Sequence, residues 1–214
     1  MSSSAMQLTT EGVCITYLNK QLFVLLQIHN QKPFKGKWGL PMLEVKSIHT
    51  IEKTLRLLAK SYPSLSLSAP VFAGLYSDPA RHPKSRVVAA TYMFFSSPDA
   101  LEKSQPDHAW HPIDKLPSSL IMDHKQIIKK SKQFLQSLTN HAPLLYLMPE
   151  RFTLSELQLC METLFDVTLD KRNFRKKIIS SGWINPTRQR QQNVAHKAAT
   201  YYTLNKKKAK ESSI

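Results

Sequence analysis

The hydrophobic and polar positions of the first 142 residues alternate between strand-like and helical periods. Two apolar runs, VCITYL and LFVLLQI, lie on either side of Asn19-Lys20-Gln21 and predict a β-hairpin over residues 13–28, whose second strand is buried on both faces. VFAGLY and VVAATYMFF predict two further strands, and AWHPIDKLP resembles a short strand that enters a turn. Strands interleaved with helices indicate an α/β or α+β domain.

Two stretches of this part have a helical period. In residues 48–62 and 122–138, apolar side chains recur at the spacing of one helix face. Asp123 stands at the start of the second stretch, and capping of that helix explains it better than catalysis does. The apolar positions are Ile48, Ile51, Leu55, Leu58 and Ala59 in the first stretch and Ile127, Ile128, Phe134, Leu135 and Leu138 in the second.

Residues 152–183 predict two helices joined by a tight turn. Thr153 and Glu156 have the spacing of a capping box, and Phe152 and Leu157 have that of a hydrophobic staple. The first helix then presents one apolar face, made by Leu154, Leu157, Met161, Leu164 and Phe165.

The second helix of this pair is rich in cations. Asp170 is a good N-cap, Gly182 is placed to end the helix in the left-handed conformation, and Leu169 and Phe174 offer a second staple. Its apolar face is predicted from Phe174, Ile178 and Ile179, while Lys171, Arg172, Arg175 and Lys176 lie largely elsewhere. A solvated charged face is the ordinary explanation of such a run. Here the one nearby acid serves as the cap, so the pattern favours a helix-turn-helix that contacts nucleic acid.

The chain continues with a predicted β-hairpin. Trp183 and Ile184 begin a strand that Pro186-Thr187 is expected to break, and TYYTL returns with β-prone residues. A basic hairpin after a recognition helix is a wing, suited to phosphate or minor-groove contacts, although a mobile β-loop has the same pattern. The tip of the predicted hairpin carries Arg188, Arg190, Gln191, His196 and Lys197.

Composition agrees with a polyanionic partner. The net charge is +15 and the pI is about 9.9, which favours nucleic acid first and a membrane surface second. Residues from 143 onward carry 13 Lys or Arg and 6 Asp or Glu, against 17 and 9 before them, so net charge alone does not locate the site. With Cys14 and Cys160 as the only cysteines, a disulfide framework is not expected. Without an apolar run of membrane-spanning length or a signal peptide, we expect a cytoplasmic protein without a membrane partner.

The segment GKWGLPMLEVKSIHTIEKTLRLLAKSYPSL resembles the Nudix box and its approach. The lead-in matches at Gly36-Lys37-Trp38 and Leu40-Pro41, but the metal-binding glutamates of the family pattern are replaced by Leu57 or Leu58, Lys60, Ser61 and Tyr62. Hydrolysis of a diphosphate by this family needs carboxylates that hold divalent cations. We therefore expect a Nudix-like fold without catalytic residues, bound metal or cofactor. Glu44 and Glu52 lie nearby but off the pattern.

The whole chain resembles the Nudix-related regulators of NAD metabolism, the NrtR family. The resemblance rests on SDPARHPKSRVVAATYMFF, on WHPIDKLPSSLIMDH and above all on LMPERFTLSELQLCMETLFDVTLDKRNFRKKIISSGWINPT. It implies an α+β chain with a Nudix-like α/β/α sandwich and a mixed sheet, followed by a winged helix-turn-helix. The expected division is 1–142 for the Nudix-like domain, which binds the effector and dimerises, 143–205 for the winged helix and 206–214 for a basic disordered tail.

The resemblance also implies how the protein works. A homodimer would bind a double-stranded DNA operator, and an ADP-ribose-like nucleotide would bind the Nudix-like domain. The candidate effector contacts are Lys37, Trp38, Arg81 and Arg86, although Trp38 could equally belong to the core and the two arginines to a solvated loop. The candidate DNA contacts are Thr153, Lys171, Arg172, Asn173, Arg175, Lys176, Lys177, Arg188, Arg190, His196 and Lys197.

Within this set, Arg172, Asn173 and Lys176 are the candidates for base edges, because arginine and lysine suit guanine and asparagine suits adenine. Two alternatives remain open. One is a working nucleotide-diphosphate hydrolase with an appended nucleic-acid-binding domain, which the missing glutamates argue against. The other is an RNA-binding adaptor, which the lack of aromatic residues among the cations makes less attractive.

Overall fold

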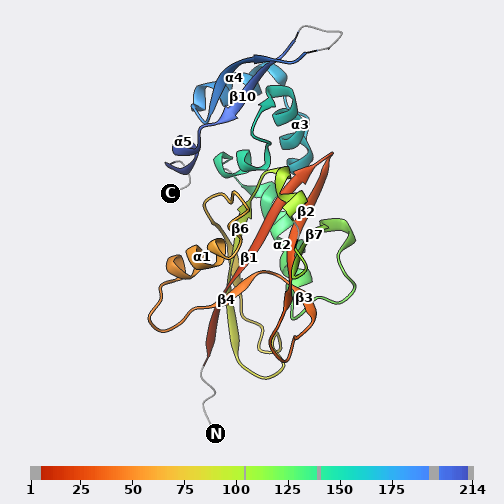
Figure 1. The fold of residues 1–214 in the computed structure, drawn as a ribbon, viewed down its shortest axis with the longest axis vertical. Coiled ribbons are helices and arrows are strands. Elements are labelled where there is room, and N and C mark those ends of the chain that lie inside the picture. The colour runs from red at the N-terminus through yellow and green to blue at the C-terminus, as the bar shows by residue number, and fades with distance from the viewer. Residues whose placement is uncertain (1–5, 104, 139–140, 193–197, 212–214) are drawn as a thin grey trace.

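A computed structural model describes residues 6–103, 105–138, 141–192 and 198–211. The N-terminal domain is built on a seven-stranded mixed sheet, and the C-terminal domain carries a three-stranded sheet at the opposite end of the long axis from the N-terminus (Figure 1). The strands of the larger sheet are β1 (Gln7–Leu18), β2 (Gln21–His29), β3 (Lys37–Gly39), β4 (Met42–Glu44), β5 (Val71–Tyr76), β6 (Val87–Phe95) and β7 (His108–Pro112).

The long strand β1 organises the larger sheet. It pairs with β6 in parallel, which makes the sheet mixed, and it forms the predicted antiparallel hairpin with β2 through a turn at Asn19-Lys20. The predicted loop PFKGKWGLPM contains the short strand β3, which pairs with β2, and ends at the first residue of β4, which pairs with β1. β5 lies at one edge beside β6.

One helix covers each face of this sheet. Helix α1 (Ile51–Lys60) packs on one face, where Gly12 of β1 lets Leu58 approach: a Cβ there would lie 3.2 Å from Leu58 Cδ2. Helix α2 (His124–Ser137) packs on the other face through Ile127, Ile128 and Leu135, as the helical period predicted. The predicted Nudix-like α/β/α sandwich is therefore confirmed.

Ile48 was wrongly predicted to belong to the buried face of the first helix. The helix begins only after Thr50, whose hydroxyl oxygen accepts a hydrogen bond from the Lys53 N–H at 3.2 Å. Ile48 therefore lies before the helix, and 79% of its surface is exposed.

The C-terminal domain has the predicted winged-helix architecture. Helices α3 (Leu154–Phe165) and α4 (Lys171–Ser181) are followed by the hairpin of β9 (Ile184–Arg190) and β10 (Thr200–Leu204), and β10 also pairs with β8 (Phe152–Thr153). Two expectations about this domain were wrong. Pro186-Thr187 does not break the strand, because β9 continues to Arg190. The stretch from 206 was expected to be disordered, but Lys206–Glu211 forms α5, in which Ala209 is fully buried.

The two domains share one hydrophobic core. The chain passes between them through the 3-10 helix η3 (Ala142–Leu147), whose Leu144, Leu145 and Leu147 are buried. The same cluster contains Val13 of the sheet and Phe174 of α4. The predicted domain boundary near residue 142 therefore falls in a packed segment. In the described part of the chain, no helix is long and apolar enough to cross a membrane.

A shared core predicts a single unfolding transition. Leu144→Ala should lower the free energy of unfolding by about 2–5 kcal/mol, because it leaves a cavity at a fully buried position. Calorimetry should still show one transition, with equal calorimetric and van't Hoff enthalpies. Leu159→Ala on α3, where the side chain is 40% exposed, is the matched control and should change the stability far less. Two separate transitions in the wild-type protein would contradict the shared core.

Candidate nucleic-acid interface and ligand cavity

Helix α4 is held on α3 by local signals that the sequence predicted. The Thr153 hydroxyl accepts from the Glu156 N–H at 3.2 Å and the Glu156 carboxylate accepts from the Thr153 N–H at 2.7 Å, which completes the capping box. Asp170 caps α4 by accepting from the Asn173 N–H at 2.8 Å, and Gly182 ends it with a φ of 69°. The caps at Asp170 and Gly182 fix the two ends of α4 and therefore the positions of its cationic side chains.

The outer face of α4 is an exposed cationic surface. Phe174 and Ile178, four residues apart, face the core, and no acid occurs between Lys171 and Ser181. Ile179 was predicted to join them, but it lies about 100° further round the helix and is 54% exposed. The exposed polar side chains of the helix are Lys171, Arg172, Asn173, Lys176, Lys177 and Ser180.

Two predicted DNA contacts, Thr153 and Arg175, are less exposed than the other described candidates. Thr153 is only 2% exposed and its hydroxyl belongs to the capping box, so the structure contradicts a direct contact by its side chain. Arg175 is half-buried and its Nη2 lies 3.4 Å from Ser155 Oγ, which holds it over the first turn of α3. Both residues line a groove of about 510 Å³ between α3, α4 and the hairpin.

The hairpin adds cations beside α4. Arg188 and Arg190 are exposed on β9, whereas His196 and Lys197 lie outside the described residues. Arg151 was not among the predicted contacts. It is an exposed cation just before β8, and its guanidinium donates a hydrogen bond to the Gln189 side chain of β9. In the sequence, the only indication of its role is its position two residues before Thr153 of the capping box. Its place beside the wing follows from the pairing of β8 with β10.

A second site lies at the other end of the molecule. A cavity of about 700 Å³ opens between the start of β1, the end of β2 and the loop between β5 and β6. Burial lowers the pKa of His29 to about 4, so this lining residue is neutral near pH 7. Lining side chains that can meet an anionic, aromatic ligand are Lys32, Phe34, Lys46, Tyr62, His82, Lys84 and Ser85.

The replaced positions of the Nudix box lie on and after α1. Leu58 and Tyr62 are 3% and 5% exposed, Leu57 is 39% exposed, and the Tyr62 hydroxyl donates to the Gln27 side chain. Burial raises the pKa of Tyr62 well above its usual value, so the phenol stays neutral. Among the residues that the structure describes, no group of three His, Cys, Asp or Glu side chains is placed to hold a metal ion. Two acids, Glu44 of β4 and Asp107, are among the residues that line the cavity.

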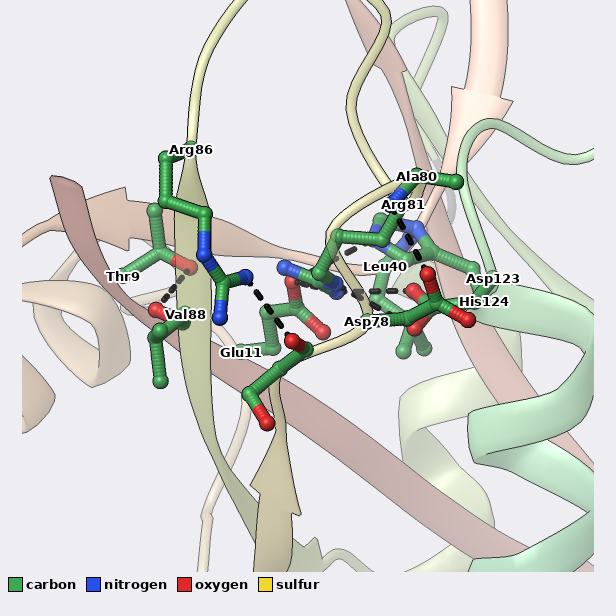
Figure 2. Close-up of polar contacts among 11 residues, drawn as sticks. Thr9, Glu11, Leu40, Asp78, Ala80, Arg81, Arg86, Val88, Asp123 and His124 are labelled. Carbon is green, nitrogen blue, oxygen red and sulfur yellow. Dashed lines mark hydrogen bonds and ion pairs between the residues drawn. The ribbon is translucent and has the colours of Figure 1, made fainter. Parts of the chain in front are cut away.

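Behind the cavity, Arg81 forms a buried ion cluster with Glu11 and Asp123 (Figure 2). Its Nη2 lies 2.8 Å from Glu11 Oε1 and 2.7 Å from Asp123 Oδ1, and its Nε donates to Asp123 Oδ2 at 3.2 Å. Burial alone would raise the pKa of Glu11, but the neighbouring His124 and Arg81 lower it below the usual value, so the carboxylate stays charged.

His124 extends the cluster to the loop after β3. The Leu40 N–H donates to His124 Nδ1 at 2.8 Å, so the ring carries its proton on Nε2, which lies 3.5 Å from Glu11 Oε1. Asp123 occupies the N-cap position of α2, as predicted, but its side chain makes no cap hydrogen bond and binds Arg81 instead. Segments far apart in the sequence are thus joined at one buried point.

The four predicted effector contacts do not form one site. Arg81 is 5% exposed, and its Nη2 and Nε bind Glu11 and Asp123, so the structure contradicts its predicted role as a diphosphate ligand. Trp38 packs edge-on against His111, with ring centroids 5.0 Å apart, beside the shared core. Arg86 donates to the Ser77 carbonyl at 2.8 Å (Figure 2), and Lys37 is exposed on β3. None of these four residues lines the cavity.

Comparisons with known proteins agree with both halves of this architecture. Residues 144–204 match the family of the NrtR DNA-binding winged helix domain. The chain is 27% identical over 180 residues to the ADPR responsive transcriptional repressor NtrR of Acinetobacter baylyi. The aligned region covers 79% of this chain and 70% of that protein.

Solved structures show the same arrangement. The crystal structure of Shewanella oneidensis NrtR complexed with a 27mer DNA has a TM-score of 0.80 and 25% identity, covering 94% of this chain and 95% of that chain. Another crystal structure of Shewanella oneidensis NrtR gives a TM-score of 0.81, again with 25% identity, covering 95% and 96%. A MutT/nudix family protein from Enterococcus faecalis shares the fold at a TM-score of 0.66 and 19% identity, covering 96% of this chain and 88% of that chain.

The buried cluster predicts a contrast between two aspartates. Asp123→Ala leaves Arg81 without one of its two acids in the interior and should lower the free energy of unfolding by about 3–5 kcal/mol. Asp114 also forms an ion pair at 2.8 Å, with Lys132, but those side chains are 68% and 44% exposed. Asp114→Ala is therefore the matched control and should cost at most about 1 kcal/mol. Urea unfolding at pH 7 measures both, and equal losses would contradict the role given to burial.

Proposed function

We propose that the chain is a member of the NrtR family, which joins a Nudix-like domain to a winged helix DNA-binding domain. On this proposal it is a transcriptional repressor whose Nudix-like domain senses ADP-ribose or a similar nucleotide. The observation that carries the proposal is the exposed cationic face of α4, framed by the wing. The relative from Acinetobacter baylyi is named for both properties, repression and response to ADPR.

The geometry supports insertion of α4 into a DNA major groove. Arg172, Asn173 and Lys176 lie in its first two turns with exposed side chains, and bidentate contacts of arginine to guanine and of asparagine to adenine read base edges there. Lys171, Lys177, Arg188 and Arg190 would contact phosphates. We propose Arg151 as a further phosphate contact, because its guanidinium is held against β9.

We propose that the cavity of about 700 Å³ holds the nucleotide, in place of the four contacts predicted from sequence. Its size lies within the range of small-molecule sites. Lys32, Lys46 and Lys84 at the rim suit a diphosphate, and the Phe34 and His82 rings, which meet edge to face with centroids 5.3 Å apart, suit a base.

We further propose that this domain binds its nucleotide without hydrolysing it. Hydrolysis would need several carboxylates that bind a divalent cation at the cavity. Leucines, a lysine, a serine and a buried tyrosine stand where the Nudix box places its glutamates. The proposed role is therefore recognition, with control exerted through the winged helix.

The DNA-binding proposal can be tested by selection from a pool of random 27-base-pair duplexes, the length bound by the Shewanella oneidensis relative. The wild-type protein should enrich one sequence class, with affinity that falls steeply with salt. Arg172→Ala should weaken binding by about 1–3 kcal/mol and relax the preference at one position. Lys125→Ala removes an equal charge from the exposed side of α2 and is the control. Unchanged binding by both Arg172→Ala and Lys176→Ala would overturn the role of α4.

The ligand proposal can be tested by titration calorimetry with ADP-ribose. Lys84→Ala should weaken binding roughly ten- to hundredfold, as expected for the loss of a charge-assisted hydrogen bond. Lys37→Ala, outside the cavity, should leave affinity unchanged. Phosphorus NMR of the same mixture with magnesium should show intact ADP-ribose. Steady conversion to AMP and ribose phosphate would show instead that the domain is a hydrolase.

A further inference from the structure

One apolar side chain of helix α4 lies among its cations instead of in the core. Ile179 is 54% exposed, the largest exposure of any large apolar side chain that the structure describes in the winged helix domain. Its neighbour Ile178 is 2% exposed and, with Phe174, supplies the contact of α4 with the core. The core therefore does not explain an isoleucine at position 179.

The position of Ile179 around the helix aligns it with two of the proposed base contacts. Each residue advances about 100° around an α-helix and about 1.5 Å along it. Ile179 follows Arg172 by seven residues, so its side chain lies only about 20° away from that of Arg172 and about 10.5 Å further along the axis. Lys176 stands between them, one turn from each. The three side chains form one stripe on the outer face of α4.

The spacing of this stripe is one that recognition helices use. Homeodomains read bases with side chains at positions i, i+3, i+4 and i+7 of the helix in the major groove. In α4 these positions are Arg172, Arg175, Lys176 and Ile179. Arg175 is drawn toward Ser155 of α3, which leaves the other three to face the groove. When Arg172 faces a base edge, Ile179 faces the bases about three steps further on, at about 3.4 Å per step.

The chemistry of isoleucine determines which base it can recognise. Its side chain has no hydrogen-bond donor or acceptor, so it cannot pair with the polar groups that guanine, adenine and cytosine present in the major groove. Thymine alone among the four bases presents a methyl group there, on C5. A contact between the two would remove both apolar surfaces from water.

The side chain and backbone of Ile179 are also largely ordered before DNA binds. A β-branched side chain in a helix has one strongly preferred χ1 rotamer, so its ordering costs less entropy than that of a lysine. The backbone is fixed by the end of the helix one turn later, where the Gly182 N–H donates to the Ile179 carbonyl at 3.4 Å. Little conformational freedom therefore remains to be lost in the contact.

We propose that Ile179 reads a thymine methyl group in the major groove and so specifies one A·T pair of the bound DNA. The proposal rests on the proposed function, because it requires the insertion of α4. Arg172 and Lys176 suit guanine and Asn173 suits adenine, so Ile179 adds the base that these polar side chains do not specify. The thymine is expected about three base pairs from the guanine that Arg172 contacts.

The test removes the methyl group from the DNA and the side chain from the protein. Each thymine of the selected duplex is replaced in turn by deoxyuridine, which keeps the base pairing and lacks only the C5 methyl group. Fluorescence anisotropy at fixed salt should show that the wild type loses about three- to fivefold in affinity at one position, the effect of one buried methyl group. Ile179→Ala should bind the thymine duplex several-fold less tightly and lose nothing further with deoxyuridine at that position, because the two changes remove the same contact.

Leu159→Ala is the matched control. Its side chain is 40% exposed and lies in the groove between α3 and the β1–β2 turn. This variant should keep the loss that the wild type shows with deoxyuridine. Alanine is the best helix former and position 179 is exposed, so urea unfolding should find Ile179→Ala about as stable as the wild type.

The outcomes separate the methyl contact from the proposed function. Equal affinity of the wild type for every deoxyuridine duplex, or a selected site without thymine, would overturn the contact. A deoxyuridine effect that persists in Ile179→Ala would also overturn it, because another group would then sense the methyl. In these cases the selected duplex is still bound, and the proposed function stands. A wild type that enriches no duplex would instead overturn the proposed function, and the contact with it.

Discussion

The burial of one arginine constrains the whole N-terminal domain. Arg81 is placed in the interior, where a guanidinium without partners would be strongly destabilising, so Glu11 and Asp123 must stay beside it. Glu11 belongs to β1, Arg81 to the loop that borders the cavity, and Asp123 to the start of α2. Since His124 also holds the Leu40 N–H, the loop after β3 is tied to the same point. A cluster of this kind leaves these segments little freedom to move independently.

That constraint connects the two proposed sites. The loop that supplies His82 and Lys84 to the cavity is joined through Arg81 to α2, and α2 packs in the core that continues into the winged helix. β1 provides a parallel connection: Thr9 lines the cavity, and the Tyr17 hydroxyl lies 3.5 Å from Thr163 Oγ1 of α3, about 27 Å further along the strand. A nucleotide changes DNA binding only if it favours one arrangement of these connected elements over another. The packed contacts through Arg81 and α2, and along β1 to α3, connect the cavity to the winged helix and allow such a preference to change the position of α4.

Sequence reasoning succeeded where the determinants are local. The capping box at Thr153, the cap at Asp170 and the stop at Gly182 depend on residues within one or two turns, so α3 and α4 could be placed from sequence. It failed where a partner lies far along the chain. Arg81 resembles a loop arginine free to bind phosphate, because its acids are 70 and 42 positions away. The α5 helix was missed for the same reason, since the burial of Ala209 depends on tertiary packing rather than on its lysine-rich neighbours.

The positions of the Nudix box can change without loss of the fold, because the contacts that hold this domain together lie elsewhere. The fold of this domain depends on β1, on the apolar side chains of α1 that pack over Gly12, and on the Arg81 cluster, none of which involves a box glutamate. Leucines and a tyrosine at those positions add apolar area to the core beneath α1, as the burial of Leu58 and Tyr62 shows. Loss of the acids therefore leaves the cavity walls and their connection to α2 intact. On the proposal that this domain binds its nucleotide without hydrolysing it, the domain keeps what recognition requires, a shaped cavity on a rigid support, without the carboxylate set that metal-assisted hydrolysis requires.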